Sequence, residues 1–185
     1  AFHEGIEFSM ARETGRVKNL AALVQKKRSS SSLGIAHTRW ATHGEVTVSN
    51  THPHSSHDGK FVMVHNGVIE NFGTLKNFLV GKGIEFASET DSEVLCNLIA
   101  YHYSELPEGD ARFIDAVRLA LPQCRGAYGI AVLCLDYPDT MIGARRGSPL
   151  VVGLGDEANF IASDASAFVG RAKEAVFLND GELAI

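Results

Sequence analysis

The sequence predicts a single α+β domain in which helices cover sheets. Two patterns support this prediction: apolar residues recur at helical spacing in the middle of the chain, and short strand-like runs come before and after that region. Sheets covered by helices are a stable way for such elements to bury their apolar faces. With 185 residues, 45% of them hydrophobic, the chain can build one domain with a sizeable core. The order of the elements does not by itself decide their topology.

The first part of the chain is expected to hold short strands, one helix and loops. The strand-like segment 5–10 comes before a helix at 17–27, which a run of serines follows. Further strands are expected at 34–37 and 61–65. The His-Pro-His sequence at 52–54 is typical of a loop between these two strands.

Three helices are expected in the middle of the chain. The first covers residues 69–80 and stops at a Gly-Lys-Gly sequence. The second begins at Thr90, because Thr90 and Glu93 have the spacing of a capping box ahead of an apolar run. The third covers residues 111–121 and ends at Pro122, which cannot continue a helix.

From Gly126 onwards the pattern changes to strands separated by turns. Glycine or proline residues end most of these runs, since both residues favour turns. The expected strands are 128–135, 140–144, 150–154, 160–163, 176–178 and 182–185.

Composition argues against several classes of partner. The net charge of -5 disfavours nucleic acid, because phosphate binding needs clustered lysine and arginine. The short basic run Lys26-Lys27-Arg28 is interpreted as a solvated linker beside the serines. No stretch approaches the roughly 20 apolar residues of a membrane span, and no signal-peptide pattern opens the chain. The 3 cysteines lie in apolar segments and indicate a reducing compartment, so we expect a cytoplasmic protein.

Residues 37–44 have the composition of a ligand-binding loop. This segment, His-Thr-Arg-Trp-Ala-Thr-His-Gly, carries imidazoles, a guanidinium, an indole and hydroxyls, and ends on a glycine that permits unusual backbone angles. Taken singly, Trp40 and His43 would be interpreted as a core aromatic residue and a hydrogen-bonded buried histidine. Arg39 offers the planar guanidinium that is best suited to bind a carboxylate.

Two further polar positions have both a structural and a functional interpretation. Asn66-Gly67 follows an alternating strand and is typical of a hairpin turn, because both residues tolerate positive φ. The Asn66 amide and the Gly67 N–H could also stabilise an oxyanion, and a turn that exposes this N–H is compatible with both interpretations. Asp91 stands at a helix start, where the helix dipole favours a carboxylate by about 0.3–1 kcal/mol. Asp91 and Arg39 could form surface salt bridges or bind the charged ends of a ligand.

The histidines raise the alternative of a metal site. His52, His54 and His57 could bind zinc or nickel, and the other histidines that could lie near them are His37, His43 and His65. No cysteine or paired carboxylate has ligand spacing with them, and the proline between the first two favours an open loop. We therefore expect no metal and no cofactor.

These motifs together resemble the class II glutamine amidotransferases. The resemblance extends over nearly the whole chain and rests on the segments 15–17, 37–44, 65–67, 88–93, 145–150 and 160–164. It implies the four-layer αββα fold of the N-terminal-nucleophile (Ntn) hydrolases, and hydrolysis of L-glutamine to glutamate and ammonia through a cysteine thioester. Residues 38–44 and 146–150 favour the branch that makes glucosamine 6-phosphate from fructose 6-phosphate over the purine-pathway and asparagine-forming branches.

The resemblance also implies roles for single residues. Asn66 and Gly67 would form the oxyanion hole, while Arg39 would bind the carboxylate of glutamine and Asp91 its ammonium. The loop 39–46 would cover the substrate. The other residues that would shape the site are Trp40, which gates the exit of ammonia, Thr42, His43 and His52. The ammonia would pass to a sugar isomerase domain of the same protein. The complete enzyme would be a homodimer.

The sequence departs from the family pattern in its first residues and in the loop. The family's chain begins with the nucleophilic cysteine, whereas this sequence begins with Ala1, and the arginine-glycine-tyrosine-aspartate-serine block expected upstream of this start is missing as well. We therefore expect residues 1–185 to be an N-terminally truncated glutaminase domain, without the isomerase domains and inactive by itself. The alternative is a non-catalytic glutamine-binding module. Val46 replaces a proline, which leaves φ less restricted at this point of the loop.

Overall fold

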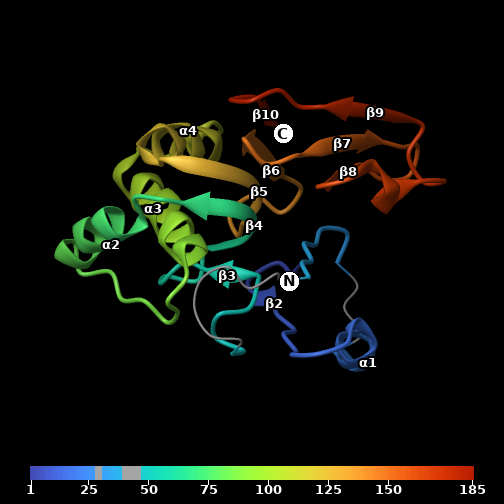
Figure 1. Cartoon of the computed structure of the whole chain (residues 1–185), viewed down its shortest axis with the longest axis horizontal. Helices are drawn as coiled ribbons and strands as arrows, with labels where there is room; N and C mark the ends of the chain where they lie inside the picture. Colours follow the sequence, from blue (N-terminus) through green and yellow to red (C-terminus); the bar gives the residue numbers. More distant parts are fainter. Residues whose placement is uncertain (28–30, 39–46) are drawn as a thin grey trace.

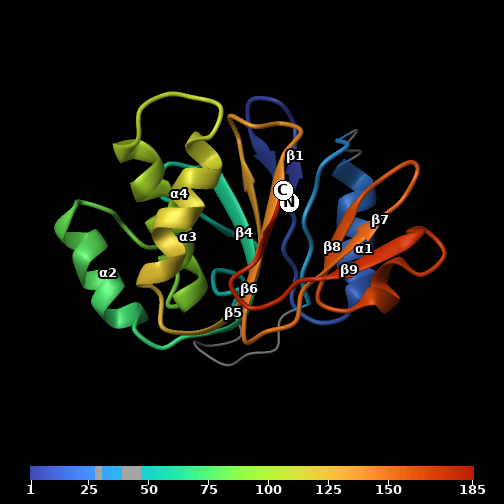
Figure 2. The same cartoon turned by 90° about the horizontal axis from the view of Figure 1, so that it is seen from above.

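The computed structural model describes residues 1–27, 31–38 and 47–185, which form layers of helices and sheets (Figure 1). Three helices, α2, α3 and α4, lie on one side of a five-stranded sheet, and a three-stranded sheet lies on the other side (Figure 2). The helix α1 (Val17–Lys27) is on the same side as the three-stranded sheet. This arrangement has the predicted α+β class.

The N-terminal segment forms a short antiparallel hairpin of β1 (Phe2–His3) and β2 (Phe8–Ser9). The predicted helix at 17–27 is confirmed as α1. The strand predicted at 34–37 is wrong, since Gly34 alone among the described residues 31–38 forms a β-bridge. Its partner there is β1, which is only 2 residues long and offers no ladder to extend.

The central sheet has the strand order β10-β6-β5-β4-β3 and is antiparallel throughout. Its strands are β3 (His54–Ser55), β4 (Phe61–Ile69), β5 (Gly126–Cys134), β6 (Met141–Arg146) and β10 (Leu183–Ala184). Strand β4 continues past its predicted end at His65, because its pairing with β5 runs from Phe61 to Ile69. Strand β3 occupies part of the segment that was predicted as a loop.

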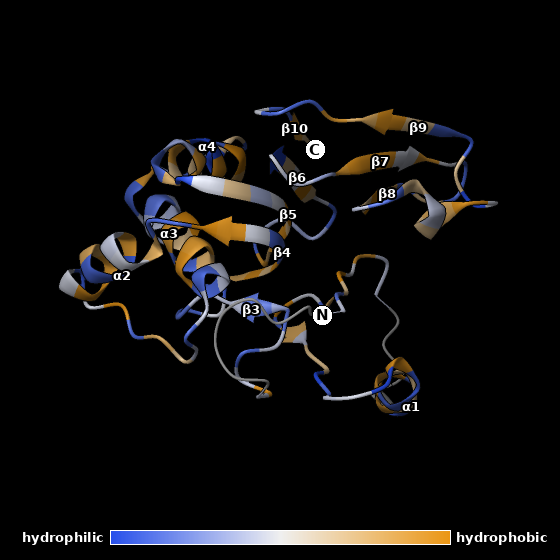
Figure 3. Ribbon diagram, viewed as in Figure 1, coloured by the Kyte–Doolittle hydropathy of each residue, from blue (hydrophilic) through white to orange (hydrophobic). Residues whose placement is uncertain are grey.

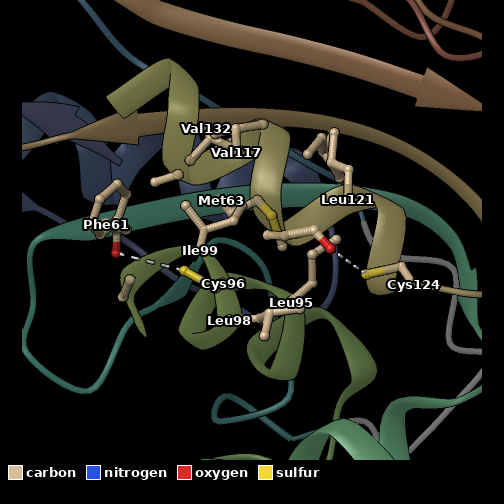
Figure 4. Close-up of a cluster of buried hydrophobic side chains, with 14 of the residues drawn as sticks. Phe61, Met63, Leu95, Cys96, Leu98, Ile99, Val117, Leu121, Cys124 and Val132 are labelled. Atoms are coloured by element: carbon tan, nitrogen blue, oxygen red, sulfur yellow. Dashed lines mark hydrogen bonds between the residues drawn. The ribbon is translucent and has the colours of Figure 1, made fainter. Parts of the chain in front are cut away.

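The helices that cover this sheet are α2 (Phe72–Gly81), α3 (Asp91–Glu105) and α4 (Arg112–Ala120), the last continued by a 3₁₀ turn (Leu121–Gln123). Apolar side chains of α3, α4, β4 and β5 form the core between helices and sheet (Figure 4). The predicted start of α3 is confirmed, since the Thr90 hydroxyl accepts a hydrogen bond from the Glu93 N–H at 3.2 Å. The Glu93 carboxylate departs from a capping box and binds the N–H groups of Ala87 and Ser88.

The second sheet has the order β8-β7-β9. Its strands are β7 (Val151–Leu154), β8 (Phe160–Ala162) and β9 (Glu174–Phe177), and a 3₁₀ turn (Ala165–Phe168) follows β8. The strands predicted after Gly126 are confirmed, with small differences at their ends. Colouring by hydropathy shows polar residues within an otherwise apolar β4 (Figure 3), and the candidate site lies beside them. No helix among the described residues is long and apolar enough to cross a membrane.

Candidate functional site

A cavity of about 500 Å³ lies between β4 and β5 on one side and the three-stranded sheet on the other. This volume is in the range of small-molecule binding sites. The polar residues that line it are His37, Thr38, His65, Asn66 and Ser163. Its apolar lining includes Val64, Ile130, Leu150 and Ile161. The cavity therefore combines an apolar wall with a polar end formed by β4 and the segment 36–38.

Asn66 and Gly67 lie in the middle of β4, opposite Gly129 and Tyr128 of β5. The hairpin turn proposed for them is therefore wrong, because the strand continues through both residues. Asn66 is exposed and lines the cavity, and its Oδ1 accepts a hydrogen bond from Nε2 of His37 at 2.8 Å. This bond directs the carbonyl end of the Asn66 amide toward His37, so the NH₂ end faces another direction.

Gly67 has a backbone conformation that favours glycine. Its φ is 125°, and a Cβ at this position would lie 2.2 Å from the carbonyl oxygen of Ala127 on β5. Any other residue would meet both a disfavoured φ and a backbone clash. The strand thus departs from regular geometry directly beside the cavity.

Ser92 of α3 connects two buried histidines next to the cavity. Its hydroxyl oxygen lies 3.1 Å from Nε2 of His52 and 2.9 Å from Nδ1 of His65. Because a serine hydroxyl has one proton, it can donate to at most one of the two imidazoles, so at least one imidazole donates to it. Burial lowers the pKa of His65, so its neutral ring suits the accepting role. The ring of His52 in turn packs against the ring of His37, with centroids 4.1 Å apart.

Asp91 is the first residue of α3 and is only 5% exposed. Its Oδ2 accepts a hydrogen bond from the Ile69 N–H at 2.8 Å and lies 3.9 Å from Nδ1 of His65. The surface salt bridge considered for Asp91 is therefore wrong. Asp91 is not one of the described residues that line the cavity. A role toward a substrate ammonium stays a prediction.

Four predicted site residues lie outside the described residues: Arg39, Trp40, Thr42 and His43. Of the remaining ones, Asn66 lines the cavity and Gly67 is the next residue of β4, although Gly67 is not part of the lining. The ring of His52 packs against that of His37, which lines the cavity. The structure places Asp91 on the helix side of β4.

The histidines considered for a metal site have separate hydrogen-bond partners. His54 Nε2 lies 3.1 Å from the Thr90 hydroxyl, and His57 Nδ1 lies 3.3 Å from the Asn97 carbonyl oxygen, while His52 faces Ser92. Within the part of the chain that the structure describes, no group of three or more side chains could hold a metal ion.

The three cysteines are buried and free of disulfides. Figure 4 shows Cys96 and Cys124 among apolar side chains of the helical layer. Burial raises the pKa of Cys96 well above its usual range, that of Cys124 to about 11 and that of Cys134 to about 12. Since the thiolate is the nucleophile, these settings do not suit catalysis.

Sequence reasoning missed His37 and Ser92 as site residues. His37 was named as the start of the ligand-binding loop and as a possible metal ligand, but its contact with Asn66, 29 positions away, was not predicted. The sequence does contain a signal for Ser92: the capping pattern at the start of α3 uses Thr90 and Glu93, so it does not explain the polar residue Ser92 between them. In the structure, the Ser92 hydroxyl faces the sheet and contacts His65.

Comparison with known proteins gives a consistent family. A family model described as a glutamine amidotransferase domain matches residues 23–108. The chain is 44% identical over 183 residues to the glutamine–fructose-6-phosphate aminotransferase (isomerizing) of Caldanaerobacter subterraneus subsp. tengcongensis, and 46% identical over 173 residues to that of Acinetobacter baylyi. These matches cover 99% and 94% of this chain. The chain spans only 29% and 27% of the length of these relatives.

A solved structure has a similar fold. It is the glutamine phosphoribosylpyrophosphate amidotransferase from B. subtilis in complex with ADP and GMP, with a TM-score of 0.62 and 27% sequence identity. The match covers 80% of this chain and 31% of that chain. This likeness confirms the predicted fold class.

Proposed function

Because the chain belongs to the glutamine amidotransferase family, we propose that residues 1–185 are the glutaminase domain of a glutamine–fructose-6-phosphate aminotransferase. In this proposal the complete protein hydrolyses L-glutamine to glutamate and transfers the ammonia to fructose 6-phosphate, which yields glucosamine 6-phosphate. Identities of 44% and 46% to two aminotransferases support this branch over the purine branch, whose solved relative shares 27%.

The observation that supports glutamine hydrolysis best is the position of Asn66 and Gly67 beside the cavity. When a nucleophile attacks the carboxamide carbon of glutamine, the carbonyl oxygen becomes an oxyanion that needs hydrogen-bond donors. The Asn66 NH₂ group and the Gly67 N–H are assigned to this role. The bond from His37 to the Asn66 carbonyl oxygen supports the assignment, since it directs the NH₂ end of the amide away from His37.

The remaining site residues belong to the proposal as well. Arg39 and Asp91 would bind the carboxylate and the ammonium of free glutamine, a pair of charges that distinguishes it from a glutamine side chain within a protein. The residues that would cover and shape the substrate are Trp40, Thr42, His43 and His52. The nucleophile is not one of Cys96, Cys124 and Cys134, because burial keeps these thiols protonated.

The partners and the location are proposed from the family. We assign the sugar isomerase activity to the part of the protein that the relatives have beyond the matched 27–29% of their length, and a homodimer to the complete enzyme. Free, buried thiols are compatible with a reducing compartment such as the cytoplasm. The net charge of -5 disfavours nucleic acid as a partner. The proposed substrate is instead a small molecule, glutamine.

The experiment is an assay of the protein that contains this chain, with glutamine and fructose 6-phosphate. We expect glutamate release and formation of glucosamine 6-phosphate in equal amounts. Glutamate release that depends on another acceptor, such as phosphoribosylpyrophosphate, would assign the protein to another branch of the family. Glutamine binding without any turnover would instead favour a non-catalytic glutamine-binding module.

A further inference from the structure

Asn66 takes part in a ring of contacts that starts and ends at its own position in β4. Its Oδ1 lies 2.8 Å from Nε2 of His37. The His37 ring packs against His52, with centroids 4.1 Å apart. His52 and His65 share the hydroxyl of Ser92, at 3.1 Å and 2.9 Å. His65 directly precedes Asn66 in the chain, which closes the ring.

The three hydrogen bonds in this ring join segments that are distant in the sequence. His37 and Asn66 are 29 positions apart, His52 and Ser92 are 40 apart, and His65 and Ser92 are 27 apart. His52 and His65 are buried, at 9% and 4% exposure, whereas His37 is half-buried at the cavity. The buried His52 therefore packs against the ring of His37, whose Nε2 bonds Asn66 at the lining of the cavity.

The contact between His37 and Asn66 determines which end of the Asn66 amide faces the cavity. A carboxamide rotated by half a turn about its terminal torsion exchanges its acceptor oxygen and its donor nitrogen. An Nε2–H of His37 is a donor, so it stabilises the orientation in which Oδ1 faces His37. In that orientation the NH₂ group is directed to its other side.

We infer that His37 is a positioning residue for glutamine hydrolysis, which holds the Asn66 amide in the orientation that donates to the developing oxyanion. This inference rests on the proposed glutaminase function. A preorganised donor stabilises the transition state because it needs no reorientation when the charge develops. Without His37, the Asn66 amide would have to adopt the donating orientation during the reaction.

The test uses two substitutions of His37 in the protein that contains this chain. His37→Phe keeps a ring to pack on His52 but removes the donor, so we expect kcat to fall at least about tenfold. The loss should not exceed the 10²–10³-fold range that is typical of a lost oxyanion donor. The KM for glutamine should stay within about twofold, because the carboxamide oxygen of bound glutamine is neutral and the oxyanion forms only during the reaction. His37→Gln keeps an N–H donor and should restore most of the activity.

A double-mutant cycle separates positioning from a general structural effect. In an Asn66→Ala background, His37→Phe should have no further effect on kcat, because its only catalytic action is through the Asn66 amide. His57→Phe is the matched control: it removes an exposed imidazole outside this cavity and should leave kcat unchanged. Additive losses in the double variant, or a His37→Phe enzyme with the kcat of the wild type, would overturn the inference.

Failure of the inference and failure of the proposed function give different results. If Asn66→Ala lowers kcat while His37→Phe does not, glutamine hydrolysis stands and the positioning role of His37 is refuted. If the unsubstituted protein hydrolyses no glutamine, both are refuted together.

Discussion

Gly67 on β4 lies so close to Ala127 on β5 that no side chain fits between them. A Cβ at Gly67 would lie 2.2 Å from the Ala127 carbonyl oxygen, and the φ of Gly67 is 125°. This close approach occurs in the strand pair that carries Asn66 to the cavity. The irregular backbone and the candidate oxyanion site therefore coincide.

Substitution of this glycine should lower the stability of the fold. For Gly67→Ala we expect a loss of more than about 1 kcal/mol, because a non-glycine residue at such a φ is strained and the Ala127 backbone blocks the methyl group. For a chain of this size that corresponds to a fall in Tm of at least about 2–4 °C. Thermal unfolding followed by circular dichroism measures it.

Gly73→Ala in α2 is the matched control. A Cβ at Gly73 meets nothing within 4 Å, and alanine favours a helix. Its Tm should stay the same or rise. A Gly67→Ala protein as stable as the Gly73→Ala protein would contradict the close approach in β4.

The 185-residue chain with its own cysteines should release no glutamate from glutamine. Burial raises the pKa of Cys124 to about 11 and that of Cys134 to about 12, and it raises the pKa of Cys96 well above its usual range. These thiols are therefore protonated at neutral pH and inaccessible to a substrate. An assay of glutamate release checks this. Turnover that disappears on replacement of any one of these cysteines would refute it.

Asp91→Asn should weaken glutamate binding by at least about 2 kcal/mol, which is the lower end for loss of one partner of a buried charge pair. The fold should remain intact, because asparagine suits a helix start and its carbonyl oxygen can still accept from the Ile69 N–H. Calorimetric titration with glutamate measures the effect. Asp115→Asn, at an exposed position in the first turn of α4, is the control. If both variants bind glutamate equally well, Asp91 does not bind the ligand, and its role is limited to the helix start and the contact with β4.

His65 should make the protein less stable in acid. Burial lowers its pKa below the usual 6.5, with His37 acting in the same direction and Asp91 opposing. The folded state thus prefers the neutral ring, so the contribution of His65 is complete above about pH 6.5 and decreases as the pH falls from there through the lowered pKa. Denaturant unfolding between pH 7.5 and about pH 5 should show a smaller decrease for His65→Gln than for the wild type. Identical pH profiles would contradict a depressed pKa.

Much of the fold could be predicted from the sequence because its signals are local. The spacing of Thr90 and Glu93 predicted the start of α3, and the apolar periodicity predicted α1 with its observed bounds. Turn residues separated the late strands correctly. Non-local pairing was the source of the errors: β4 passes through Asn66-Gly67 because β5 pairs with it, and no local pattern reveals that partner.

The site was predictable by residue type but not by arrangement. Asn66 and Gly67 were identified with a donor role while their backbone was expected to turn. A surface salt bridge was one of two interpretations of Asp91, whose carboxylate is buried and accepts from the Ile69 N–H of β4. The ring through His37, His52 and Ser92 depends on three segments that meet only in the folded chain. Such contacts have no spacing in the sequence that predicts them.

The kinetics of Asn66→Ala test the central claim most directly. The measurement is the kcat and KM for glutamine hydrolysis by the protein that contains this chain, for wild type and variant. If Asn66 donates to the oxyanion, kcat falls by about 10²–10³, or roughly 3–4 kcal/mol, while KM for glutamine changes far less. A variant that keeps the wild-type kcat and changes only KM would contradict the account and leave Asn66 as a strand residue that contacts the substrate.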